Sequence, residues 1–118
     1  MTRILVVEDD ADILREVSEL LRDEGLDVAT AVDGAQALQV LRSQPRPSVI
    51  LLDLALPGDD GWKLRGAQLA DPALAPIPVL IFSGLETAAE DARRLGAAGF
   101  VSKPCRVEDL LGALARFR

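Results

Sequence analysis

Histidine is absent from all 118 residues. Without an imidazole, the chain has no histidine base, no histidine metal ligand and no phosphohistidine of its own. Any phosphohistidine in its chemistry must come from another molecule. The single cysteine, Cys105, excludes an internal disulfide, and there is no histidine to activate its thiol. We interpret Cys105 as a small filler side chain, with a redox or nucleophilic role as the alternative.

Long apolar runs and excess positive charge are also missing. No apolar stretch approaches the ~20 residues that span a bilayer, and Met1-Thr2-Arg3 leads directly into a strand-like segment, which leaves no room for a signal peptide. We therefore expect a cytoplasmic protein without a membrane partner. The net charge of −6 argues against direct binding of nucleic acid. With 49% apolar and 27% charged residues, the sequence is typical of one globular domain over residues 1–118.

Five short apolar segments alternate with five longer segments of helical periodicity. The strand-like segments are 4–7, 26–31, 49–52, 79–82 and 100–101, and the helical patterns cover about 13–21, 33–41, 62–70, 85–95 and 107–117. Strands joined by crossover helices form a parallel sheet that is covered on both faces. The pattern predicts an α/β fold, with a doubly wound five-stranded parallel sheet in the order 2-1-3-4-5.

Polar residues follow four of these five strand-like segments. They are Glu8-Asp9-Asp10 after the first, Asp53 after the third, Ser83 after the fourth, and Lys103-Pro104 after the fifth. In a doubly wound sheet, function gathers beyond the carboxyl ends of the strands, so we expect these side chains to converge. Carboxylates held together require a cation, and an all-oxygen set without histidine suits Mg²⁺.

A carboxylate beside Mg²⁺ can attack phosphorus and form an acyl phosphate. An ammonium group and a hydroxyl then stabilise the phosphoryl oxygens, and Asp53, Lys103 and Ser83 would supply these three parts. Each residue alone has a simpler interpretation. Asp10 is suited to cap a helix, Ser83 to sit in a turn, and Lys103 to be a surface charge. Their joint position at strand ends is what favours a site.

These same segments resemble the bacterial response-regulator receiver family of two-component signal transduction. The resemblance lies in Ile4-Leu-Val-Val-Glu-Asp-Asp10, Leu51-Leu-Asp53-Leu-Ala-Leu-Pro57-Gly58, Pro78-Val-Leu-Ile-Phe-Ser83-Gly84 and Phe100-Val-Ser-Lys103-Pro104. It extends from about residue 3 to residue 117, and it implies a flavodoxin-like (βα)₅ fold. No single motif is specific, but their ordered combination is.

The resemblance also implies roles for individual residues. Glu8 and Asp9 would be an acidic pair that binds metal, Asp53 would be both the phosphoacceptor and a metal ligand, and the Ala55 main-chain carbonyl would be a further ligand. Ser83 would be the conserved hydroxyl, and Lys103 would pair with the phosphoryl group. Phe100 would be the switching aromatic, and the Lys103-Pro104 peptide bond would be cis. The metal would be Mg²⁺, with Mn²⁺ as an alternative.

As a receiver, the chain would take its phosphoryl group from a histidine kinase or a histidine phosphotransfer protein. It would catalyse its own phosphorylation and dephosphorylation, yet act as a signalling protein rather than as an enzyme. Phosphorylation would draw the Ser83 hydroxyl inward and let Phe100 rotate inward. The face formed by the fourth helix, the fifth strand and the fifth helix would then signal to an output partner.

Three other interpretations account for parts of the pattern. A flavodoxin-like cofactor protein would carry a phosphate loop after the first strand, where Glu8-Asp9-Asp10 would repel phosphate. A phosphatase of the haloacid dehalogenase type needs a second aspartate at position 55, which is Ala55. A degenerate receiver would act only as a phosphorylation-independent interaction module. The presence of Glu8, Asp9, Asp53, Ser83 and Lys103 together argues against that last alternative.

Overall fold

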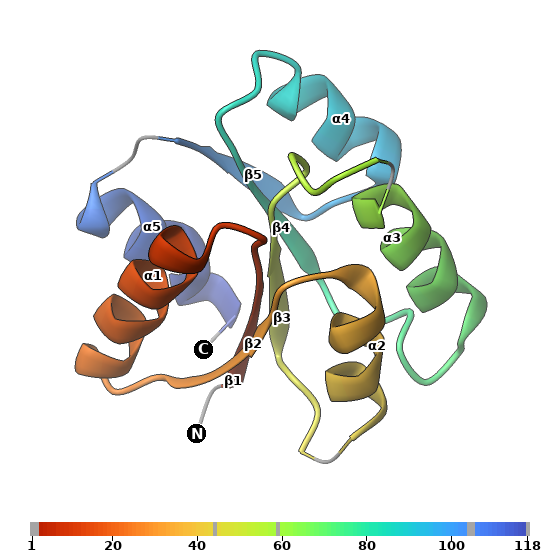
Figure 1. The fold of residues 1–118 in the computed structure, drawn as a ribbon, viewed down its shortest axis with the longest axis horizontal. Coiled ribbons are helices and arrows are strands. Elements are labelled where there is room, and N and C mark those ends of the chain that lie inside the picture. Colours follow the sequence, from red (N-terminus) through yellow and green to blue (C-terminus); the bar gives the residue numbers. More distant parts are fainter. Residues whose placement is uncertain (1–2, 44, 59, 104–105, 118) are drawn as a thin grey trace.

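The computed structural model describes residues 3–43, 45–58, 60–103 and 106–117. Five parallel strands form one sheet in the order β2-β1-β3-β4-β5, which confirms the predicted doubly wound fold (Figure 1). The strands are β1 (Arg3–Val7), β2 (Asp27–Ala31), β3 (Val49–Leu52), β4 (Val79–Ser83) and β5 (Gly99–Ser102). The helices are α1 (Ala11–Asp23), α2 (Gly34–Arg42), α3 (Asp60–Ala70), α4 (Ala88–Leu95) and α5 (Val107–Leu114), followed by a short 3₁₀ turn, Ala115–Phe117.

Two apolar layers enclose the sheet. Alternate strand residues face opposite sides, so that Leu5 and Val7 pack in one layer while Ile4 and Val6 pack in the other. The first layer includes buried residues of α2, α3 and α4, and the second includes those of α1 and α5. Figure 1 shows the same division, with α1 and α5 on one side of the sheet and α2, α3 and α4 on the other. The aliphatic runs in the sequence are therefore strands buried on both faces.

Aspartate side chains mark the starts of helices α1 and α2. Asp10 precedes α1, and its side chain accepts hydrogen bonds from the N–H groups of Asp12 and Ile13. Asp33 likewise accepts from the Gln36 N–H at the start of α2. Both interactions satisfy amides that have no partner inside the helix. The capping interpretation of Asp10 is confirmed.

The register of the sheet determines which loops meet. Val7 pairs with Leu52 across β1 and β3, so the residues that follow these two strands lie side by side. Ser83 pairs with Ser102 across β4 and β5, which brings the residue after β5 to the same edge. The carboxyl ends of β1, β3, β4 and β5 therefore lie at the same edge of the sheet. Among the described residues, none of the helices is long and apolar enough to cross a membrane.

Candidate functional site

Three carboxylates gather at the carboxyl edge of the sheet. Glu8 and Asp9 follow β1, Asp53 follows β3, and one oxygen from each lies within 4.8 Å of the others. Glu8 and Asp53 are buried, with 2% and 3% of their surface exposed, whereas Asp9 is exposed. The predicted convergence of these three residues is confirmed as geometry.

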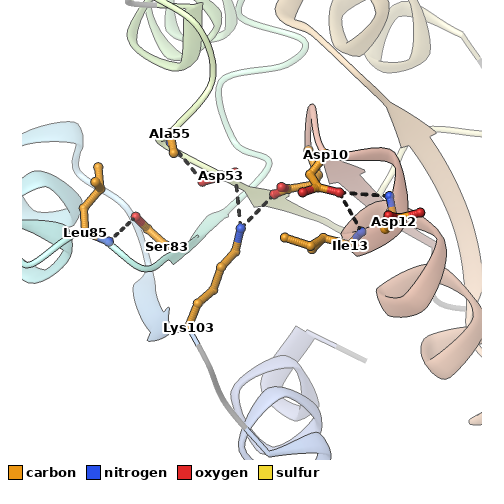
Figure 2. Close-up of polar contacts among 9 residues, drawn as sticks. Asp10, Asp12, Ile13, Asp53, Ala55, Ser83, Leu85 and Lys103 are labelled. Atoms are coloured by element: carbon orange, nitrogen blue, oxygen red, sulfur yellow. Dashed lines mark hydrogen bonds and ion pairs between the residues drawn. The ribbon is translucent and has the colours of Figure 1, made fainter.

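Asp53 is held by donors at both carboxylate oxygens. Its Oδ1 accepts a hydrogen bond of 2.9 Å from the Ala55 N–H, and its Oδ2 lies 3.2 Å from Lys103 Nζ. Its backbone N–H donates to the Val7 carbonyl at 3.0 Å. Figure 2 shows the Asp53 carboxylate between the Ala55 backbone and the Lys103 ammonium. The side chain is therefore fixed in place, with the Ala55 main chain beside it.

Lys103 reaches the carboxylates from the end of β5. Its backbone N–H donates to the Ser83 carbonyl at 3.0 Å, which continues the strand pairing and aims the side chain along the sheet edge (Figure 2). Its Nζ donates to Glu8 Oε2 at 2.9 Å and lies 4.9 Å from the centre of the Phe82 ring. The sequence motifs assign Lys103 to a phosphoryl group, but they do not reveal its direct bond to Glu8, 95 positions away.

The cluster carries more negative than positive charge. Three carboxylates face one ammonium group among the described residues. Burial and the hydrogen bond to Asp53 raise the pKa of Glu8 to about 7, against the lowering effect of Lys103. Two buried carboxylates in contact resist simultaneous ionisation. The site therefore favours any further positive charge that can reach these oxygens.

A hard divalent cation fits this donor set. All the clustered ligand atoms are carboxylate oxygens, which Mg²⁺ prefers, and no thiolate or imidazole is among them. The exposed Asp9 lies at the solvent side of the cluster, so an ion can enter without opening the core. Glu8, Asp9 and Asp53 are the residues suited to hold it.

Ser83 and Phe100 lie outside this carboxylate cluster. Ser83 is fully buried at the end of β4, and its Oγ accepts a hydrogen bond of 3.1 Å from the Leu85 N–H. Figure 2 shows the Ser83 side chain pointing toward Leu85. Phe100 is 44% exposed on β5, the strand that ends at Lys103. The side chain predicted to switch inward is thus outside the core in this state.

Three of the predicted features remain predictions. Pro104 and Cys105 lie outside the described residues, so the cis Lys103-Pro104 bond and the filler role of Cys105 remain predictions. The Ala55 carbonyl also remains a predicted ligand. The described contact of Ala55 with the site is made by its N–H, which donates to Asp53 Oδ1.

This chain is similar to known proteins over nearly all of its length. Residues 4–115 match the family described as the response regulator receiver domain. The transcriptional regulatory protein PdtaR of Mycobacterium tuberculosis (strain ATCC 25618 / H37Rv) is 34% identical over 121 residues. That alignment covers 98% of this chain and 58% of PdtaR, so the chain spans little more than half the length of this relative.

Two solved structures of response regulators are similar to this chain over nearly its full length. The chemotaxis response regulator CheY4 of Vibrio cholerae is 30% identical with a TM-score of 0.87, and the alignment covers 100% of this chain and 99% of that one. The Mn²⁺-bound form of the response regulator Rcp1 is 29% identical with a TM-score of 0.75, covering 97% and 89% of the two chains.

Proposed function

The chain belongs to the response regulator receiver domain family, and from this we propose that it accepts a phosphoryl group on Asp53 in a two-component signalling system. The observation that carries the proposal is the position of Asp53. It is a buried carboxylate with one donor on each oxygen, next to two further carboxylates that suit a metal ion. These are the parts that phosphoryl transfer to a carboxylate requires.

The phosphoryl donor would be a phosphohistidine of another protein, because this chain contains no histidine. An Asp53 oxygen attacks phosphorus and forms the P–O bond of an acyl phosphate. The P–N bond to the donor imidazole breaks, and its electron pair stays on the imidazole nitrogen, which then takes up a proton. Lys103 Nζ, now 3.2 Å from Asp53, stays close enough to compensate charge on the phosphoryl oxygens.

Mg²⁺ would be held by Glu8, Asp9, Asp53 and the main-chain carbonyl of Ala55, with Mn²⁺ as an alternative. When bound, the ion supplies positive charge for the phosphoryl oxygens. The excess of carboxylates over ammonium groups and the raised pKa of Glu8 support this assignment. The similarity to Rcp1, whose structure is a Mn²⁺-bound form, supports it from outside the chain.

Phosphorylation would be read by Ser83 and Phe100. The Ser83 hydroxyl would leave the Leu85 N–H and donate to a phosphoryl oxygen, and Phe100 would turn inward from its exposed position. The face formed by α4, β5 and α5 would then change and bind an output partner. Phe100, 44% exposed on β5, is an apolar side chain on this face that an output partner would contact.

We assign the chain a signalling role in the cytoplasm, in which it catalyses only its own phosphorylation and dephosphorylation. Its upstream partner would be a histidine kinase or a histidine phosphotransfer protein. The net charge of −6 supports an output through protein contacts rather than direct nucleic-acid binding by this domain.

The proposal is tested by incubating the protein with Mg²⁺ and a small-molecule phosphodonor and measuring its intact mass. We expect the mass of one phosphoryl group to be added to the wild type and not to Asp53→Asn. Asp10→Asn is the matched control, since Asp10 is an exposed helix cap beside the site and asparagine caps equally well. Equal labelling of wild type and Asp53→Asn would reject Asp53 as the acceptor.

A further inference from the structure

Helix α3 carries two polar side chains into the interior. Arg65 is 9% exposed and Gln68 is fully buried, although both residue types are mostly found at protein surfaces. No carboxylate among the described residues forms an ion pair with Arg65. Burying a guanidinium group in this way is costly unless hydrogen bonds compensate for the lost water.

The hydrogen bonds of Arg65 go to the end of α4. Its Nε donates to the Leu95 carbonyl at 3.0 Å and its Nη2 donates to the Gly96 carbonyl at 3.1 Å. Its Nη1 donates to Gln68 Oε1 at 2.8 Å. The carbonyls in the last turn of a helix have no partner inside that helix, and they form its negative end. Arg65 therefore satisfies the C-terminal end of α4 with a charge of the favourable sign.

Gln68 fixes the other side of this network. Its Nε2 donates to the carbonyls of Leu74 and Ile77, at 3.0 and 2.7 Å, in the connection between α3 and β4. The Arg65 guanidinium is thus held by a side chain that is itself held at two points. Because the group is planar and stays charged, it keeps this geometry at any ordinary pH.

Among the residues that the structure describes, none anchors the opposite end of α4 in a comparable way. The buried residue there is Ala88, which offers little apolar area to the sheet. Thr87 makes no side-chain bond to the helix backbone and instead donates to Asp91 at 2.7 Å on the surface. This end adjoins Ser83, whose Oγ accepts from the Leu85 N–H. The helix is bound firmly at one end and weakly at the other.

We propose that Arg65 holds the C-terminal end of α4 as a fixed pivot, so that a change at Ser83 moves only the N-terminal half of this helix. Arg65 acts through α4, because its described hydrogen bonds go to Leu95, Gly96 and Gln68 and not to the residues that would bind phosphate or metal. It is therefore a positioning residue for the conformational response. We call the contact of Arg65 with the Leu95 and Gly96 carbonyls the clamp. Figure 1 shows α3 and α4 on the same side of the sheet, as this contact requires.

The clamp itself is tested without phosphorylation, by amide hydrogen exchange in the metal-free protein. Gly96 and Ala97 report on the clamped end, since their N–H groups donate to Arg93 and Ala92 carbonyls. In Arg65→Met these two amides should exchange about tenfold faster or more, while the Ala88 amide changes less than about twofold. The matched control is Arg94→Met, which removes an exposed arginine that pairs with Glu90 on the surface. Unchanged exchange at Gly96 and Ala97, or equal acceleration along all of α4, would overturn the clamp.

The pivot is tested by adding Mg²⁺ and phosphodonor and recording amide chemical shifts. In the wild type, shifts within 85–91 should exceed those within 93–97, and in Arg65→Met they should spread into 93–97. Larger shifts at 93–97 in the wild type overturn the pivot, and this arm needs no variant that might fold poorly. This second arm rests on the proposed function. If no phosphoryl group is added, the proposed function fails while the exchange result still decides the clamp.

Discussion

Asp53 and Glu8 place two carboxylates in the interior with Lys103 as their shared cation. Such an arrangement opposes the folded state, because each carboxylate loses water and repels the other. The raised pKa of Glu8 is the direct sign of this conflict. A residue set that costs stability at one end of the sheet is typical of a functional site.

Asp53→Asn should therefore make the metal-free protein more stable. It removes one of three clustered charges, and the asparagine oxygen still accepts the Ala55 N–H. We expect the free energy of unfolding to rise by about 1 kcal/mol in urea titrations with a chelator present. Asp10→Asn, at an exposed cap, should change it by less than about 0.5 kcal/mol. A variant at Asp53 that is no more stable than wild type would show that the carboxylates do not repel.

Lys103→Ala separates the chemistry from the response. Mg²⁺ affinity should be retained or increased, since the variant loses a competing positive charge beside Glu8 and Asp53. Amide shifts of Leu85 and Phe100 on phosphorylation should be lost, because no ammonium draws the phosphoryl group toward Ser83. Lys63→Ala, on the exposed side of α3, is the control. Wild-type shifts in Lys103→Ala would refute this role.

At the scale of elements, α3 follows the loop after Asp53 and connects it to the rest of the molecule. The helix begins at Asp60, and a Cβ added at Gly61 would meet the Leu54 side chain at 3.4 Å and the Asp53 carbonyl at 3.8 Å. We expect a change around Asp53 to reach the first turn of α3 through these neighbours. Trp62, 39% exposed in that turn, is positioned to report it.

The fluorescence of Trp62 should accordingly change on Mg²⁺ addition. It is the single tryptophan and the chain has no tyrosine, so the emission has one source. Titration with Mg²⁺ should give a saturable change in the wild type and none in Asp53→Asn. A flat titration of the wild type would count against a metal near this turn.

A further prediction concerns Phe100 on β5 and Ser83 at the end of β4. Phe100 should lose its exposure on phosphorylation in the wild type but keep it in Ser83→Ala, which lacks the hydroxyl that would move. The measurement is attenuation of the Phe100 ring signals by a soluble paramagnetic agent, with the buried Phe82 as internal reference. Equal protection of Phe100 in both proteins would exclude the Ser83 hydroxyl from the switch.

The elements themselves were largely predictable, and the reason is local. The strands β1, β3 and β4 contain aliphatic runs, and Asp10 and Asp33 mark helix starts, so short-range chemistry decides these elements. The site followed because parallel strands end at one edge, which brings Glu8, Asp53 and Lys103 together. Only the fold was needed to place them.

Arg65 and Gln68 could not be found in this way. Their positions in α3 are buried because of how this helix packs against α4 and the 71–78 connection, and the sequence pattern of α3 places charged and amide side chains outside. The exposed state of Phe100 was equally beyond reach, since it depends on tertiary packing rather than on residue type. Interactions across distant segments are what the sequence alone leaves open.

On the scale of the whole molecule, an ion that binds the folded site stabilises the entire domain. At a Mg²⁺ concentration of about 100 times its Kd, the free energy of unfolding should rise by about 2.7 kcal/mol. Denaturant titrations measure it, and a chelator should reverse the gain. Asp53→Asn should lose most of the gain because it removes one of the three clustered carboxylates. Equal stabilisation of wild type and variant would place the ion elsewhere.

The account as a whole depends on a covalent phosphoryl group at one carboxylate. The most direct test is to phosphorylate the protein with Mg²⁺ and a phosphodonor, reduce it with borohydride, and sequence its peptides by mass spectrometry. Reduction converts an acyl phosphate to an alcohol, so the account predicts homoserine at position 53 and unaltered aspartate at positions 9, 10 and 60. Homoserine at another position, or none in a protein that has gained the phosphoryl mass, would contradict it.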